Sequence, residues 1–92
     1  MINRVLVLQA LTDVANICYN SDKKSDNFAL SIITTYMELQ IKLSNIYLLS
    51  CNNINFNDNH IVEKDVLIIE PVVGQEIEIP FEHIISCSVI DL

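Results

Sequence analysis

The chain is short, acidic and rich in apolar residues, with 92 residues, a formal net charge of −7 at pH 7 and a hydrophobic fraction of 51%. This length suits one domain and is too short for two, so we expect a single domain over residues 1–92. A net charge of this sign repels phosphate backbones and disfavours direct binding to nucleic acid. No apolar run is long enough to span a membrane, and polar residues interrupt the start of the chain, unlike a signal peptide. Three widely spaced cysteines suit free, buried thiols, so a cytoplasmic protein is expected.

Residues 3–20 predict a helix, because their apolar side chains recur at spacings of three and four. The apolar stripe is wide, which suits a helix laid across a sheet. Residues 21–27 are polar and predict a loop. The expected stripe consists of Val7, Leu11, Val14 and Cys18, flanked by Leu8, Ala10, Ala15 and Ile17.

Residues 28–49 allow two interpretations. Apolar residues at spacings of three and four, with capping residues just before them, are compatible with a second long helix. The segment 37–44, however, alternates strictly between apolar and polar side chains, and the residues before it favour strands. We predict strands here. The alternating apolar residues are Met37, Leu39, Ile41 and Leu43.

Beyond residue 49 the pattern predicts strands throughout. Residues 66–81 read as a hairpin with its turn around residues 72–75, where Gly74 is the only glycine of the chain. Pro80 cannot donate a hydrogen bond to a neighbouring strand, which places its strand at a sheet edge or ends it. Residues 84–90 predict a last strand. Its expected faces are Ile85, Cys87 and Val89 on one side and Ser86 and Ser88 on the other.

Together these elements predict an α+β fold. An N-terminal helix would pack on, or cap, an antiparallel β-meander of about five strands, which could curl into a small barrel.

The net charge lies entirely in the last third of the chain. Acidic and basic residues cancel over residues 1–57, whereas eight acids and one lysine follow from Asp58 onward. Within this acidic pole, Glu76 and Glu78 alternate with isoleucines, so their carboxylates share one strand face. Glu82 would lie on the same side if the strand continued past Pro80.

Two interpretations of these acids remain open. They could form a docking ridge for lysines and arginines of a partner. They could also form a solvated face that prevents edge-to-edge pairing of a very apolar hairpin. If the face is functional, the partner-binding residues are Glu70, Glu76, Glu78 and Glu82.

The sequence offers little support for catalysis, a metal site or a cofactor. Paired carboxylates act as acid and base only when burial splits their pKa values, and these two are expected to face outward. On a strand, His83 and Cys87 would stand too far apart to bond. The surroundings of His60 lack the spacing of a calcium loop. The aromatic residues have few basic neighbours, so we expect them to pack in the core rather than to stack on bases. We therefore expect no enzyme.

The segment from Glu78 to Cys87 resembles the closing strands of the Sm-like RNA-binding barrels, in which a His-x-Ile-Ser stretch follows a strand and a helix precedes the barrel. Here the stretch is His83-Ile84-Ile85-Ser86, and the resemblance covers about a tenth of the chain. It implies a hexameric or heptameric ring with salt-sensitive affinity for RNA. The chain lacks the glycine of the first Sm motif and has acids where that family carries basic residues.

These observations lead to three functional hypotheses. The first is a small acidic, non-enzymatic protein-binding module, encoded by a phage or other mobile element, that occludes a basic nucleic-acid-handling protein of the host, as anti-defence and anti-CRISPR inhibitors do. The second is a homo-oligomeric structural or assembly subunit that buries surplus apolar surface. The third is a degenerate Sm-like barrel.

Overall fold

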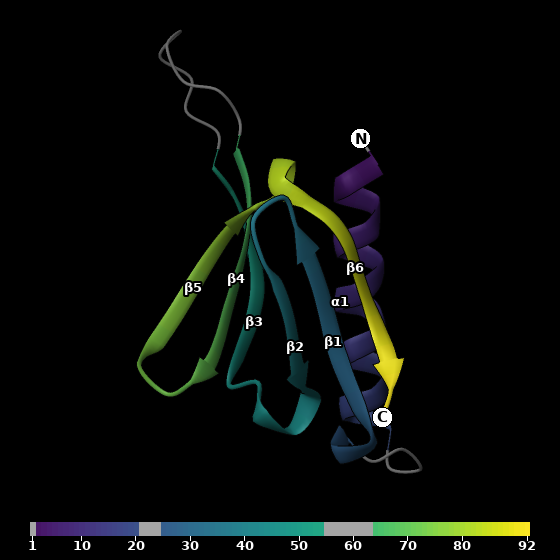
Figure 1. The fold of residues 1–92 in the computed structure, drawn as a ribbon. Helices are drawn as coiled ribbons and strands as arrows, with labels where there is room; N and C mark the ends of the chain where they lie inside the picture. The colour runs from purple at the N-terminus through teal and green to yellow at the C-terminus, as the bar shows by residue number, and fades with distance from the viewer. Residues whose placement is uncertain (1, 21–24, 55–63) are drawn as a thin grey trace, which may run out of the picture.

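The computed structural model describes residues 2–20, 25–54 and 64–92. These residues form one α-helix, six strands and three short 3₁₀ helices (Figure 1). The predicted α+β class is confirmed, and residues 28–49 contain strands rather than a second α-helix. In chain order the elements are α1 (Ile2–Tyr19), η1 (Ser25–Asn27), β1 (Phe28–Thr34), β2 (Glu38–Lys42), η2 (Leu43–Asn45), β3 (Leu48–Ile54), β4 (Lys64–Val72), β5 (Gln75–Pro80), η3 (Phe81–His83) and β6 (Ile84–Asp91).

The strands form two antiparallel sheets of three strands each. Sheet A has the order β2-β1-β6, and sheet B has the order β3-β4-β5. After β5 the chain passes through η3 and leaves sheet B, so that β6 pairs with β1 instead of extending the meander. Figure 1 shows sheet B at the left and sheet A beside α1 at the right. The two sheets are not closed into a barrel.

Helix α1 packs on sheet A through a stripe turned slightly from the predicted one. The buried helix residues cluster with Leu30 and Ile32 of β1, whereas Leu11 is only partly buried and Cys18 is exposed. Stripes that differ by one position are neighbours on a helix of 3.6 residues per turn, and the contact with the sheet decides between them. The buried stripe consists of Val7, Ala10, Val14 and Ile17.

One hydrophobic cluster joins the helix and both sheets. Leu67 and Ile69 of β4 and Ile79 of β5 have exposed fractions of 0%, and they belong to the same cluster as the buried stripe of α1. Burying a leucine or isoleucine side chain contributes roughly 1.5–3 kcal/mol relative to leaving it exposed. Sheet B is therefore attached to the rest of the molecule by burial of its inner face, which leaves its edge strand β5 available for other contacts.

A bulge in sheet A changes the predicted faces of β6. Ile33 pairs with Ser86 and Thr34 pairs with Ile84, so one residue of β6 is skipped in the register. Ile84 is therefore buried, and Ile85, predicted to share a face with Cys87, is 59% exposed. A bulge puts two residues opposite one and reverses the alternation locally, which a strict period of two does not anticipate.

The turn between β1 and β2 is closed by a buried threonine. Thr34 Oγ1 accepts hydrogen bonds from the backbone N–H of Met37 at 2.9 Å and of Tyr36 at 3.2 Å, and it donates to the Met37 carbonyl at 3.1 Å. The next residue, Thr35, donates its backbone N–H to the His83 carbonyl at 3.0 Å. This turn therefore ties sheet A to η3, the connection between the sheets.

Candidate functional site

The strand β5 forms an edge of sheet B and presents two carboxylates to solvent. It pairs with β4, with Ile77 opposite Ile69 and Glu78 opposite Ile68. Alternation along the strand turns Ile77 and Ile79 toward the core, so Glu76 and Glu78 both lie exposed on the other face. The predicted placement of these two glutamates is confirmed.

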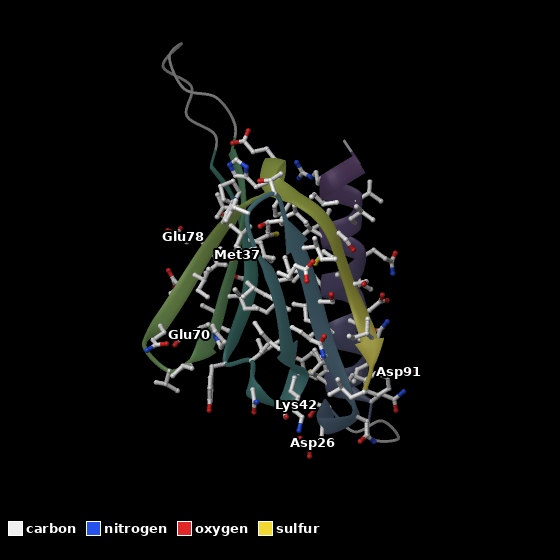
Figure 2. The ribbon with its side chains drawn as sticks, in the orientation of Figure 1. Asp26, Met37, Lys42, Glu70, Glu78 and Asp91 are labelled. Atoms are coloured by element: carbon white, nitrogen blue, oxygen red, sulfur yellow. The ribbon has the colours of Figure 1, made fainter. Side chains whose placement is uncertain are left out.

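The two carboxylates produce a local negative field on this side of the molecule. Side chains two residues apart on a strand stand about 6.8 Å apart, so the charges of Glu76 and Glu78 add and their mutual repulsion is weakened by water. Figure 2 shows Glu78 and Glu70 along sheet B, well away from Lys42 and Asp91 at the lower end of sheet A. A basic partner approaching β5 therefore meets two acids side by side.

Glu70 holds the β4–β5 turn as well as carrying charge. Its Oε1 accepts a hydrogen bond from the backbone N–H of Gly74 at 2.9 Å. Gly74 has φ +84°, a left-handed conformation that glycine adopts without a steric penalty. One oxygen of Glu70 thus closes the turn, and its carboxylate is less available to a partner than those of Glu76 and Glu78.

Glu82 lies off the strand. β5 ends at Pro80, and Glu82 sits on η3, so the condition under which it would share the face of Glu78 is not met. Its side chain is 75% exposed, and its Oε1 lies 3.7 Å from Nε2 of His83. The ring of His83 packs edge-on against Tyr36 with the ring centroids 5.6 Å apart. Glu82 therefore extends the acidic surface around the end of β5 without belonging to the strand.

Other predicted features are outside the site. Asp58, His60 and Glu63 of the acidic pole lie outside the described residues, as does Phe56. Within the described ranges, no cluster of three or more His, Cys, Asp or Glu residues could hold a metal ion. The helix of the described part of the chain lacks the length and apolar character needed to cross a membrane.

The cysteines and aromatics are less buried than predicted. Cys87 is buried, and desolvation raises the pKa of its thiol to about 11, whereas Cys18 and Cys51 are exposed. The prediction of three buried thiols is therefore wrong for two of them. Phe81 lies in the core and Phe28 packs against it, but the three tyrosines are exposed, because a short chain has too little core to cover each of them. They are Tyr19, Tyr36 and Tyr47.

Sequence reasoning missed an exposed apolar surface at one end of sheet B. It joins the start of β3 to the β4–β5 turn, since the backbone N–H of Tyr47 donates to the Glu70 carbonyl at 2.9 Å and Leu48 pairs with Glu70. The signal was present in the sequence as two valines directly before Gly74, where a turn normally carries polar residues. We call this surface the apolar tip; it consists of Tyr47, Leu48, Val72 and Val73, which are 62%, 38%, 51% and 70% exposed.

Comparison of the chain with protein-family models, with curated proteins and with solved structures gave no match in any of the three.

Proposed function

We propose that this chain is a small, non-enzymatic protein-binding module whose acidic edge strand β5 docks on a basic surface of another protein. The observation that carries the proposal is the exposure of Glu76 and Glu78 side by side on that edge. Carboxylates held on a strand are oriented by its backbone, so binding them loses less conformational freedom than binding the same groups on a loose tail. Arginine in particular binds carboxylates through paired, charge-assisted hydrogen bonds.

The partner we propose is a protein whose basic surface normally holds nucleic acid. Such a surface is selected to bind anions, so an acidic strand can occupy it and exclude the nucleic acid by steric occlusion or phosphate mimicry. An origin in a phage or other mobile element, with a nuclease or related defence protein of the host as target, agrees with the asparagine- and isoleucine-rich composition and the concentrated acidity. Binding of this kind is steered electrostatically and weakens as salt is added.

The test is affinity capture on the immobilised chain from a lysate of its native host, followed by mass spectrometry. The double variant Glu76→Lys/Glu78→Lys should lose the basic protein that the original chain retains. Glu38→Lys/Asp91→Lys is the matched control, because it changes the net charge equally at two exposed acids of sheet A. The control should retain the partner.

Two outcomes would contradict the proposal. If the β5 variant retained the same basic protein as the original chain, the acids would only confer solubility. If both double variants lost it equally, net charge and not this strand would govern binding. Both variants should melt within a few degrees of the original chain, since the substituted side chains are exposed.

A second candidate function is a homo-oligomeric assembly subunit, and the edge position of β6 favours it. Within the described part of the chain, sheet A places β6 beside β1 at its edge, and β6 carries no charged side chain from Ile85 to Ile90. An uncharged edge strand is open to pairing with another chain. Sedimentation equilibrium at micromolar concentration separates the candidates, since an assembly subunit must be oligomeric, and a mass of six or seven chains would agree with the resemblance to Sm-like barrels. Ile85→Lys should dissociate such an assembly.

A further inference from the structure

The apolar tip consists of four exposed apolar side chains at the start of β3 and at the β4–β5 turn. Leu48 pairs with Glu70, and β3 and β4 run antiparallel, so Leu48 lies diagonal to Val72 on the same face of the sheet, while Tyr47 precedes β3 and stands level with Pro71. Side chains opposite or diagonal to one another across such a pair lie within about 4.5–8 Å. The two-residue turn then carries Val73 to the outermost position of the hairpin. Exposed apolar side chains that are grouped in this way, rather than scattered, indicate an interaction surface.

The residues of the turn conflict with local preference. Two-residue hairpin turns favour Asn, Asp and Gly, whose side chains suit the turn backbone and are well solvated. Here the position before Gly74 is Val73, a β-branched residue with a 70% exposed side chain. Positions that break a local preference are expected at functional or strained sites. The exposed valines are therefore candidates for contact with a partner.

The tip is held in place by its own contacts. Gly74 takes the left-handed conformation that the turn requires, and its N–H donates to Glu70 Oε1 at 2.9 Å. On the other strand, Tyr47 is tied by its backbone N–H to the Glu70 carbonyl. A surface that is ordered before binding loses less entropy when a partner docks.

The charges around the tip select the kind of partner. Glu70 lies on β4 opposite Leu48, and Glu76 follows the turn on β5. An apolar centre with an aromatic residue, surrounded by charged side chains, is the usual anatomy of a protein interface. A second copy docking tip to tip would bring these acids against their own copies, whereas a basic surface would pair with them.

We infer that the apolar tip is the anchor of the proposed interface, inserting Leu48, Val72 and Val73 into an apolar pocket of a basic protein whose rim of lysines and arginines pairs with Glu76 and with the oxygen of Glu70 that does not bind Gly74. This inference rests on the proposed function, because it names the pocket that the partner of β5 must contain. The acids steer the encounter and the tip keeps the complex together, since desolvated apolar anchors act mainly on dissociation.

The experiment measures binding kinetics against the protein captured by the immobilised chain, after its identification and purification. Val72→Ser/Val73→Ser should weaken binding at least tenfold, mainly through faster dissociation, and leave the salt dependence of association unchanged. Glu76→Lys/Glu78→Lys should instead slow association and flatten its salt dependence. Val5→Ser/Leu8→Ser on α1 is the matched control, with exposed fractions of 66% and 41% in the original side chains, and should bind as the original chain does. Val73→Ser alone provides a second, milder tip variant.

The possible results separate the two proposals. If the tip variants bind like the original chain and the charge variant does not bind, the tip is not the anchor. The acidic edge strand then remains the binding surface. Loss of affinity in the helix control equal to that in the tip variants would also overturn it. Capture of another copy of this chain, or of a protein without a basic surface, would overturn the partner chemistry. If no protein is captured, both the proposed function and the proposed anchor are contradicted.

Discussion

Sheets A and B have the same number of strands and the same antiparallel pairing, but they face different surroundings. Sheet A is covered by α1, and its central strand β1 is buried or half-buried along its whole length. Sheet B buries one face in the shared core, while its edge strand presents Glu76 and Glu78 and its end presents the apolar tip. The comparison indicates that both sheets and the helix share the framework, whereas sheet B also holds the features that we propose to meet a partner.

Removing a core side chain from either sheet should have the largest effect on stability. Leu30→Ala in sheet A and Leu67→Ala in sheet B should each lower the free energy of unfolding by about 2–5 kcal/mol, because both side chains are essentially fully buried in one cluster. Val73→Ala at the tip should change it by less than about 0.5 kcal/mol. Urea denaturation followed by circular dichroism measures these differences. Two separate unfolding transitions in a core variant would show that the sheets unfold independently, which would contradict a core shared by both sheets.

The turn of sheet A should depend on one hydroxyl. Thr34→Val removes the oxygen that binds the backbone of Tyr36 and Met37 at a position only 5% exposed. We expect a loss of about 1–2 kcal/mol, because backbone groups of the turn would lose their partner. Its neighbour Thr35 is exposed, so Thr35→Val is the matched control and should be nearly neutral. Equal effects of the two substitutions on the melting temperature would contradict this account of the turn.

The effect of Cys87 ionisation should be confined to alkaline pH. Burial raises the pKa of its thiol from the ordinary value of 9.0 to about 11, so between these values the folded state keeps a proton that the unfolded state releases. The stability that this thiol contributes is therefore complete below about pH 9 and is lost as the pH rises toward 11. Cys87→Val should remove this part of the pH dependence when urea denaturation is repeated from pH 8 to pH 10.5.

Thiol labelling extends this comparison to both sheets. Cys51 of sheet B and Cys18 of α1 are exposed and should react with Ellman's reagent at pH 8, whereas Cys87 of sheet A should react only after unfolding. Rapid labelling of Cys87 in the folded protein would show that sheet A opens without global unfolding, contrary to this prediction.

Much of sheet B follows from its sequence. The alternation of Glu76 and Glu78 with isoleucines fixes their outward placement once the strand forms, and Gly74 marks the turn. The position of Glu82 could not be fixed, because it depends on whether the chain continues past Pro80 or bends into η3. The apolar tip was likewise missed, since Leu48 and Val72 become neighbours only after β3 pairs with β4.

The sequence by itself determined the kinds of elements, their approximate bounds and the side chains that alternate along each strand, because these depend on neighbouring residues and on periods of 2 and 3.6. Only the tertiary structure decided that β6 returns to β1, that a bulge turns Ile85 outward and that α1 buries Ala10 and Ile17. These outcomes depend on contacts between segments far apart in the chain. Several pairings of the same strands satisfy the local pattern, and the one adopted is selected by the packing of the whole core.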